Sequence, residues 1–296
     1  MGNKLNVGYI FVVQITTMQT NIEIHSLVDV DMNEISALYN LSYQNYYVPI
    51  NLSVEQFQNK LTMEDIKLNY SIGASIDGKL VGFLLYGIRN YNDIKTAYVG
   101  GTGVCPEQRG KKITQQMLDY SFPQLKENGV KQIYLEVNTK NDFAINAYEA
   151  SGFEKTRVLN SYKGIPILIV NPMHEIVSFE DLDLITGENF WDIKPTWKND
   201  IQSVKNILEN CIVNGIYEDG ILVAYKIINK NNTRIYQFGV HHDYRNRYLA
   251  SVLFSDLKNK EVKMINVDER EISTNDFIKS MGLELYDRQY EMKKEL

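Results

Sequence analysis

A short basic loop is the segment whose residue types most directly suggest a chemical role. The stretch 106–113, Pro-Glu-Gln-Arg-Gly-Lys-Lys-Ile, lies between a predicted strand and a predicted helix. A helix N-terminus exposes unpaired backbone N–H groups and a partial positive charge, so this junction can bind a pyrophosphate. Gly110 permits close approach to the backbone, while Arg109, Lys111 and Lys112 add cationic side chains. The alternative is a solvated basic helix cap.

A second block of residues follows this loop at a defined distance. Residues 135–153 contain Leu-Glu-Val, an asparagine, an alanine, a tyrosine and a final Gly-Phe. The run Val-x-Pro-x-x-Arg-Gly-Lys from Val104, followed by an apolar helix, resembles motif A of GNAT acetyltransferases. The second block resembles the Leu-Glu-Val…Asn-x-x-Ala-x-x-x-Tyr-x-x-x-Gly-Phe block of the same family. The order and spacing of both blocks agree, and the resemblance covers residues 98–153.

The resemblance implies an acetyl-CoA-dependent N-acetyltransferase that transfers the acetyl group directly to a primary amine in a ternary complex. Acetyl-CoA would be a co-substrate. Asn141 is expected near its pantetheine arm or sulfur, and can also cap the following helix. The family usually has small residues where this chain has Lys112 and Thr114, which makes the loop bulkier. The residues expected to bind acetyl-CoA are Val104, Arg109, Gly110, Lys111, Lys112, Ile113, Thr114 and Asn141.

Two residues of the second block are candidates for the proton transfers of acyl transfer. The amine must lose a proton, and the leaving thiolate should gain one. The resemblance places Tyr148 as the general acid, since a phenol is neutral at pH 7 and can donate a proton. Glu136 is the candidate base, directly or through water, because desolvation in a cleft would raise the pKa of its carboxyl group. The alternatives are a core tyrosine and a structural glutamate that faces solvent or pairs with a lysine.

The predicted strand at 95–104 is unusually rich in glycine. Glycine in a strand often marks a bulge or close contact with a ligand. In the family a bulge on this strand directs a backbone N–H at the thioester, and residues 101–104 are the candidates here, with Val104 making the backbone contact. These glycines would also widen the acceptor side of the cleft and permit a longer acyl group.

Aromatic residues near the first predicted helices are candidates for the acceptor pocket. Tyr43, Tyr46, Tyr47 and Phe83 are the residues expected to line it, together with Phe57. An aromatic cluster in an acidic chain would suit a cationic amine, either a small molecule or a peptide N-terminus or lysine. Each of them could instead be an ordinary core residue.

The elements that position these residues follow from hydrophobic periodicity and turn signals. Up to residue 153 the expected order is βααβββαβαβ. The Asp-Gly pair at 77–78 predicts a β-hairpin, because this dipeptide accepts the positive φ angles of a tight turn. The order predicts an α/β (α+β) domain with a mixed, mainly antiparallel sheet flanked by helices.

The pattern partly repeats in the second half of the chain. Val104-Cys-Pro-Glu-Gln-Arg109 and Val240-His-His-Asp-Tyr-Arg245 separate valine and arginine equally, and a second Asp-Gly hairpin is predicted at 219–220. Two copies of one unit are the simplest interpretation.

The expected domain organisation follows from this repeat. Residues 1–17 would be an N-terminal extension, because a domain-like start follows Met18, or would form a short extra strand. Residues 18–170 would be a catalytic GNAT domain, and residues 171–296 a degenerate GNAT-like domain.

The second copy lacks the chemical residues of the first. Ile278, Asn266 and Glu271 stand where the first copy has its tyrosine, glutamate and asparagine. His241 and His242, expected on a strand, would point to opposite faces and are poorly placed to share a metal. The second copy is therefore interpreted as a scaffold, a wall of the acceptor site or a homodimerisation surface.

The composition limits the class of protein. The chain has 296 residues, of which 44% are hydrophobic, and a formal net charge of −6. This charge argues against a nucleic-acid binder with a general basic surface. The apolar runs are too short for a membrane span. Cys105 and Cys211 lack metal-ligand spacing, so a cytoplasmic protein with reduced thiols and no metal is expected. A non-catalytic acyl-CoA-binding or sensor protein remains an alternative function.

Overall fold

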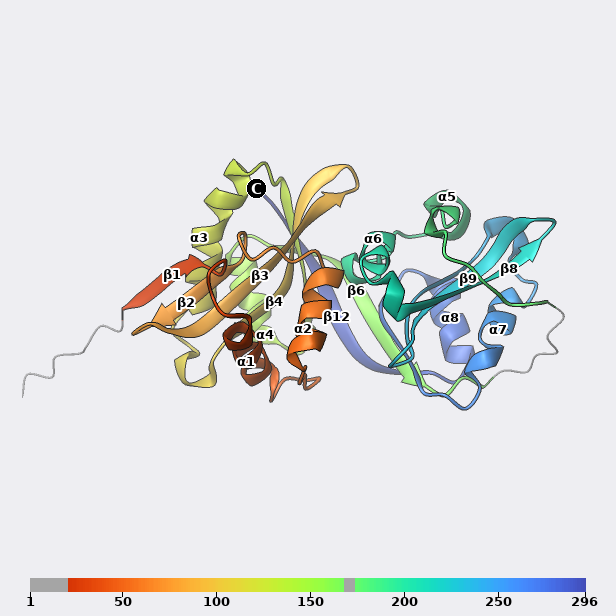
Figure 1. Cartoon of the computed structure of the whole chain (residues 1–296), viewed down its shortest axis with the longest axis horizontal. Helices are drawn as coiled ribbons and strands as arrows, with labels where there is room; N and C mark the ends of the chain where they lie inside the picture. Colours follow the sequence, from red (N-terminus) through yellow and green to blue (C-terminus); the bar gives the residue numbers. More distant parts are fainter. Residues whose placement is uncertain (1–20, 168–173) are drawn as a thin grey trace, which may run out of the picture.

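The computed structural model describes residues 21–167 and 174–296. These residues form one continuous twelve-stranded sheet with the order β1-β2-β3-β4-β5-β12-β6-β11-β10-β9-β8-β7. Figure 1 shows two lobes connected by the long strands β6 and β12. Most strand pairs are antiparallel, and the two parallel pairs are β4–β5 and β10–β11. The predicted mixed, mainly antiparallel sheet with flanking helices is confirmed.

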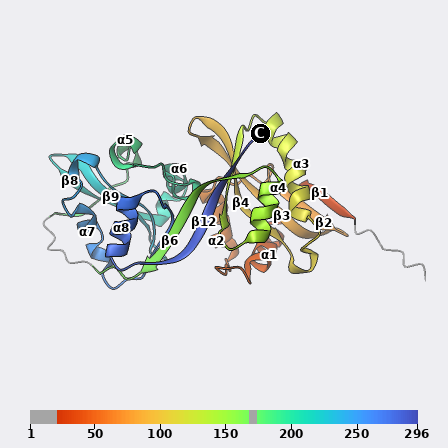
Figure 2. The ribbon, with the colours of Figure 1, turned by 180° about the vertical axis from the view of Figure 1, so that it is seen from behind.

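The first unit has the predicted order of elements. α1 and α2 cover one face of its sheet, and α3 and α4 are seen on the other face in Figure 2. The Asp77-Gly78 turn has positive φ at both residues, as the hairpin requires. The elements are β1 (Ile22–Ser26), α1 (Met32–Tyr43), α2 (Val54–Met63), β2 (Ile72–Ile76), β3 (Lys79–Tyr91), β4 (Ile94–Val104), η1 (Pro106–Gln108), α3 (Ile113–Glu127), β5 (Gln132–Asn138), α4 (Asp142–Ala150) and β6 (Glu154–Gly164).

The second unit repeats this order with shorter helices. The helices at Ile201–Lys205 and Leu249–Leu253 are each only five residues long, and each is followed by a short 3-10 helix. Its elements are β7 (Val177–Ser178), η2 (Leu182–Leu184), α5 (Gly187–Phe190), η3 (Trp197–Asn199), α6 (Ile201–Lys205), η4 (Leu208–Asn210), β8 (Cys211–Glu218), β9 (Ile221–Asn229), β10 (Arg234–Val240), η5 (His242–Tyr244), α7 (Leu249–Leu253), η6 (Ser255–Leu257), β11 (Val262–Asp268), α8 (Ile272–Ser280) and β12 (Glu284–Glu295).

One expectation about the second unit is wrong. His241 and His242 lie beyond the end of β10, where His241 precedes the short helix η5 and His242 begins it. The chain turns there because it must leave the sheet, so the alternation of a strand does not apply to these two residues.

The final strands of the two units are exchanged. β12 pairs antiparallel with β5 of the first unit, whereas β6 pairs antiparallel with β11 of the second. β6 and β12 also pair with each other, which makes the two sheets continuous. Each unit therefore depends on a strand from the other half of the chain.

The hydrophobic cores reflect the same exchange. Met292 of β12 is fully buried in the core of the first unit, while Tyr162 of β6 is buried in the core of the second. These two residues occupy equivalent positions in the repeat, since each follows its Gly-Phe or Gly-Leu pair at the same distance. The exchanged strands thus fill the two cores in equivalent register.

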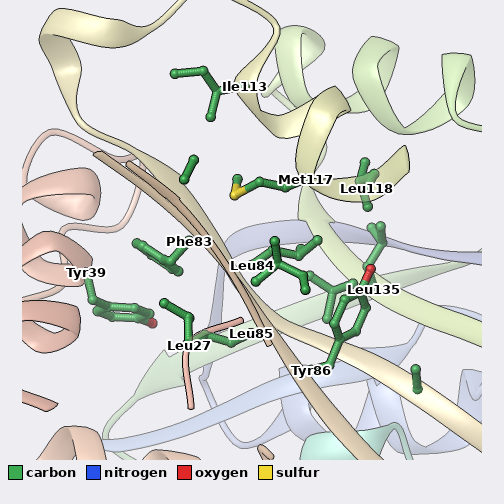
Figure 3. Packing of buried hydrophobic residues seen from close by; sticks show 14 of the residues in the cluster. Leu27, Tyr39, Phe83, Leu84, Leu85, Tyr86, Ile113, Met117, Leu118 and Leu135 are labelled. Carbon is green, nitrogen blue, oxygen red and sulfur yellow. The ribbon is translucent and has the colours of Figure 1, made fainter. Parts of the chain in front are cut away.

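The core of the first unit lies on both faces of β3. Phe83 points toward Tyr39 of α1, with ring centroids 5.6 Å apart. Leu84 points to the opposite side, toward Met117 of α3 (Figure 3). This alternation fixes α1 and α3 on opposite faces of the sheet. Among the described helices, none has the length and apolar character needed to cross a membrane.

Candidate functional site

The site lies where two parallel strands of the first unit separate. β4 and β5 pair over four residue pairs, from Thr96↔Gln132 to Val99↔Leu135, and then diverge. A groove of about 1620 Å³ opens beyond this point. Its walls come from β4, β5, α1, α4 and the loop before α3, and also from the second unit.

The loop between β4 and α3 has the backbone geometry of an anion site. Gly110 has φ of 80° and Lys112 has φ of 57°, both left-handed, before α3 begins at Ile113. Residues of alternating hand turn successive backbone N–H groups toward one concavity, which suits a phosphate. A side-chain carbon placed on Gly110 would meet nothing within 4 Å, so this side of the loop is open.

Arg109 holds the loop in place through two hydrogen bonds to backbone carbonyl oxygens. Its guanidinium donates to the carbonyl oxygens of Val104 at 3.3 Å and Ser42 at 2.9 Å. The side chain therefore fastens the loop to β4 and to the end of α1. Its charge still lies at the loop, but its N–H groups are partly used by the protein.

Most of the residues expected at the acetyl-CoA side line the groove together. These are Val104, Arg109, Gly110, Lys112, Ile113, Thr114 and Asn141. The exception is Lys111, whose Nζ donates to Gln108 Oε1 at 2.5 Å on the exposed side of the loop. Asn141 caps α4, since its Oδ1 accepts from the Ala144 N–H at 3.2 Å. Lys112 occupies a left-handed position that costs a non-glycine residue about 1–2 kcal/mol.

The bulge on β4 is at Gly100, which lies outside the predicted range 101–104. Leu85 of β3 pairs with Gly101 and Tyr86 pairs with Val99, so Gly100 is the extra residue. Its carbonyl oxygen accepts from Lys60 Nζ at 2.7 Å. The register of strand pairing determines which residue of a Gly-rich strand forms the bulge. The sequence does not contain this register, so it could not identify Gly100.

The glycines of β4 make room for neighbouring side chains, so the expectation that they widen the cleft is wrong. A Cβ on Gly100 would lie 2.5 Å from Glu64 Oε2, and one on Gly103 would lie 2.5 Å from the ring of Phe83. Phe83 itself is fully buried in the core, which corrects its predicted place in the acceptor pocket. The space that these glycines leave is already filled.

Tyr148 lies on α4 and faces the groove while being 7% exposed. Burial raises the pKa of its hydroxyl to about 12, and the nearby Thr102 side chain opposes the shift. The hydroxyl is therefore protonated at neutral pH. This is the state in which a phenol can donate a proton.

Three tyrosines of α1 and its following loop reach across the opening. The Tyr43 hydroxyl donates to the Thr102 carbonyl oxygen at 3.1 Å on β4. Tyr47 donates to the Lys140 carbonyl oxygen at 2.7 Å, and Tyr46 accepts from Asn141 Nδ2 at 3.4 Å. All three tyrosines line the groove. The segment thus connects β4 to the turn between β5 and α4.

Glu136 forms a buried ion pair with a residue of the second unit. Lys198 Nζ lies 2.8 Å from Glu136 Oε2, and the glutamate side chain is 2% exposed. Burial acts to raise the pKa of the carboxyl group, but Lys198, Asn266 and Tyr98 together hold it below its ordinary value. The expected upward shift is therefore wrong, because the sequence did not reveal the lysine that would face this carboxylate.

A second buried ion pair adjoins the bulge. Lys60 Nζ of α2 lies 2.5 Å from Oε2 of Glu64, the residue that ends this helix four positions later. Burial lowers the pKa of Lys60, and Glu64 opposes the shift. The charges of Glu136 and Lys198 also act on Lys60. Sequence reasoning missed this pair, although its spacing of four residues at the end of a predicted helix was a visible signal.

The second unit supplies one wall of the groove. Trp197 anchors the wall, since its ring stacks on Tyr98 with centroids 5.2 Å apart and its Nε1 donates to the Glu64 carbonyl oxygen at 3.0 Å. Lys198 follows directly. The other groove residues from this half of the chain are Ile207, Asn210, Asn229, Asn231, Asn232, Arg234, Tyr236, Ile265 and Gln289. Among the earlier alternatives for the second unit, its position fits that of an acceptor-site wall.

The first unit combines a separating pair of parallel strands, a bulged strand β4 and a left-handed loop before α3. The second unit repeats these features in β10, β11 and the loop before α7. Together they define a tandem of two GNAT folds. The solved tandem GNAT protein from the clavulanic acid biosynthesis pathway aligns with a TM-score of 0.73 at 14% identity, covering 93% of this chain and 98% of that chain. A putative acetyltransferase from Pyrococcus horikoshii aligns with a TM-score of 0.67 at 13% identity, covering 100% of this chain and 93% of that one.

The sequence comparison gives the family. Residues 33–153 match the model of the acetyltransferase (GNAT) family. N-alpha-acetyltransferases of Sulfurisphaera tokodaii and Saccharolobus solfataricus are each 31% identical over 98 residues, and the match covers 30% of this chain and 59% of each relative. Residues 33–153 therefore form a domain of the GNAT acetyltransferase family, and the chain spans 59% of the length of these two relatives.

Proposed function

We propose that this protein is an acetyl-CoA-dependent N-acetyltransferase that moves an acetyl group directly to a primary amine. The observation that carries the proposal is the groove between β4 and β5, in which Tyr148 is buried and protonated next to the bulged strand. Direct transfer needs no covalent acyl-enzyme. The site must therefore bind both substrates, stabilise the oxyanion of the thioester and transfer the protons.

The residues of the first unit divide these tasks. The left-handed loop from Arg109 to Ile113 would hold the pyrophosphate of acetyl-CoA through backbone N–H groups. Acetyl-CoA would supply the activated acyl group. Tyr148 would protonate the leaving sulfur. Backbone groups around Gly100 on the bulged strand would face the thioester carbonyl.

The proton from the amine needs an acceptor in the same groove. Glu136 remains the candidate base, acting through water, since its low pKa keeps it ionised but makes it a weak base for direct transfer. Substitution of Glu136 by glutamine would test this role.

The acyl group is proposed to be acetyl. The space beside the β4 glycines is occupied by Phe83, Tyr39 and Glu64, which disfavours longer chains. The amine is proposed to be an α-amino group, because the matching relatives are named N-alpha-acetyltransferases. A groove of about 1620 Å³ is large enough for a peptide terminus.

Tyr148→Phe tests the proposed function. The variant keeps the ring and loses the hydroxyl, so it should bind CoA normally and lose roughly 10²–10⁴-fold in the chemical step. The assay follows CoA thiol release with acetyl-CoA and short peptides that have free N-termini. Tyr120→Phe, which removes a hydroxyl from an exposed residue of α3, is the matched control. Unchanged turnover in Tyr148→Phe would remove its role, and CoA binding without turnover on any amine would favour the sensor function.

A further inference from the structure

The second unit contains a cleft at the position that corresponds to the groove of the first. β10 and β11 are parallel and pair at Arg234↔Lys263 and Ile235↔Met264, after which they diverge. A cavity of about 490 Å³ opens there. This volume lies within the usual range of small-molecule sites, about 300–1,000 Å³.

The loop of this cleft is built like the first but has lost its free positive charge. Arg245 Nε donates to the Val240 carbonyl oxygen at 3.4 Å, as Arg109 does to Val104. However, Asp192 holds the same guanidinium through a 2.8 Å hydrogen bond and so neutralises it. The following α7 is only five residues long. A pyrophosphate is therefore disfavoured here, and the cleft is not a repeat of the acetyl-CoA site.

The carboxylates of the cavity wall differ in their partners. Asp192 pairs with Arg245 at 2.8 Å, and Asp268 pairs with Arg270 at 2.6 Å. Among the described residues, Glu271 is the wall carboxylate without an ion pair. Glu271 is therefore the carboxylate of this wall that is open to an ion pair with a ligand.

The position of Glu271 leaves its carboxylate available. Glu271 is the N-cap residue of α8, as Asn141 is the N-cap residue of α4. Unlike Asn141, its side chain makes no capping hydrogen bond within the described residues. Its backbone carbonyl is fixed instead by the N–H and Nδ2 of Asn275, at 2.9 and 2.8 Å. Burial raises the pKa of Glu271 to about 7; Asp268 and Asp192 raise it further, while Thr274 and Arg157 oppose the shift.

Aromatic and unpartnered polar groups complete the wall. Tyr248 lies in the left-handed region with φ of 62° and is 78% exposed, which is unfavourable for a bulky residue. Such strain is retained mainly at sites with a function. Phe277 lines the same cavity. Thr196 is 1% exposed, and its hydroxyl has no hydrogen-bond partner among the described residues.

We propose that this second cleft binds a small organic ammonium ion with an apolar body. Glu271 is its counter-ion, the Tyr248 and Phe277 rings contact the cation and its apolar part, and the Thr196 hydroxyl offers a hydrogen bond. Aromatic faces attract organic cations, and an ammonium group supplies the counter-charge that Glu271 lacks among the described residues. This site is separate from the proposed acetyl-transfer groove and does not depend on its activity.

Calorimetric titration of the full chain tests the proposal. The probe is 2-phenylethylammonium, and 2-phenylethanol is the neutral analogue of the same shape. The wild-type protein should bind the ammonium ion and bind the alcohol at least tenfold more weakly. Glu271→Gln should weaken ammonium binding at least tenfold, and Tyr248→Ala should weaken it severalfold.

Matched variants separate this cleft from the groove of the first unit. Asp276→Asn removes an exposed carboxylate of the same helix, α8, and should leave binding unchanged. Tyr148→Phe should also bind the probe normally. Absence of probe binding to the wild-type protein, or equal binding by Glu271→Gln, would overturn the proposal. Binding of two equivalents of CoA to the wild-type protein, with the second equivalent lost in Tyr248→Ala, would also overturn it, because the cleft would then be a CoA site.

Discussion

Buried charges in the groove of the first unit are compensated across the two halves of the chain. Glu136 comes from β5, whereas Lys198 comes from η3 in the second unit. A buried carboxylate without a partner would be strongly destabilising, because water no longer solvates it. Lys198 therefore stabilises the groove and also determines the protonation state of Glu136.

Lys198→Met should destabilise the protein by about 3–5 kcal/mol at neutral pH, because it leaves Glu136 uncompensated. The pKa of Glu136 is depressed in the folded protein, so its contribution is present above the unfolded pKa and is lost as the pH falls through the folded one. The deficit of the variant should therefore shrink on acidification. Urea unfolding at several pH values measures this.

Two further variants control that experiment. Adding Glu136→Gln to Lys198→Met should recover much of the lost stability, since the buried charge is then absent. Lys194→Met removes a partly exposed lysine paired with Asp200 and should cost no more than about 1 kcal/mol. A double variant no more stable than Lys198→Met would show that the ion pair is not the cause.

Glu271 should affect stability in the opposite direction. Its pKa is about 7 in the folded protein against an ordinary 4.5, so the folded state binds a proton that the unfolded state releases. Stability should fall as the pH rises through this window, and the loss should be complete above pH 7. Glu271→Gln should then be more stable by up to about 3 kcal/mol at pH 8 and unchanged near pH 4. Equal differences at both pH values would contradict the assignment.

At the scale of elements, the bulge of β4 couples the strand to α2. Gly100 stands against Glu64, whose carboxylate holds Lys60, and Lys60 in turn binds the Gly100 carbonyl oxygen. The bulge and the buried ion pair therefore support each other. Such a bulge re-aims backbone groups of the strand toward the groove.

Gly100→Ala should disturb this arrangement. The new Cβ would lie 2.5 Å from Glu64 Oε2 and from Ile66 Cδ1, and relief of such overpacking costs about 1–3 kcal/mol. Turnover should fall together with stability. Gly101→Ala, whose Cβ would meet Tyr39 at 3.2 Å, is the control and should be milder. Similar effects of the two substitutions would argue against a special role for the bulge.

Structural features that depend on a few neighbouring residues could be predicted from the sequence. The hairpins at Asp77-Gly78 and Asp219-Gly220 form with positive φ, because this requirement is contained in the two residues themselves. The Asn141 cap was also open to prediction. The partner of Glu136 and the bulged residue were not, since both depend on contacts between segments distant in the chain. The acetyl-CoA-binding and catalytic roles remain predictions.

At the scale of the molecule, the exchanged strands join the two halves into one structure. The proposed boundary near residue 170 divides the sequence but leaves β12 in the sheet of the first unit. A cut at this boundary would expose the edges of β5 and β6. Exposed edges promote aggregation.

Residues 18–170 produced alone should fail to form a stable native monomer. Replacing β12 by their own β6 would put Tyr162 where Met292 is buried and would remove the 2.6 Å hydrogen bond from its hydroxyl to Asn275 Oδ1. Size-exclusion chromatography and circular dichroism should show aggregation or partial folding. Co-production with residues 171–296 should restore a folded complex. A cooperatively melting monomer of the first half would contradict this expectation.

The position of β12 also constrains the order in which the two units can fold during synthesis. A ribosome releases the chain from the N-terminus onward, so β5 emerges long before the strand that pairs with it. The first unit would stay incompletely closed until β12 leaves the exit tunnel, and its unpaired edge would be open to chaperones during that interval. The first unit, although it comes first in the sequence, can reach its final structure only after β12 has been synthesised.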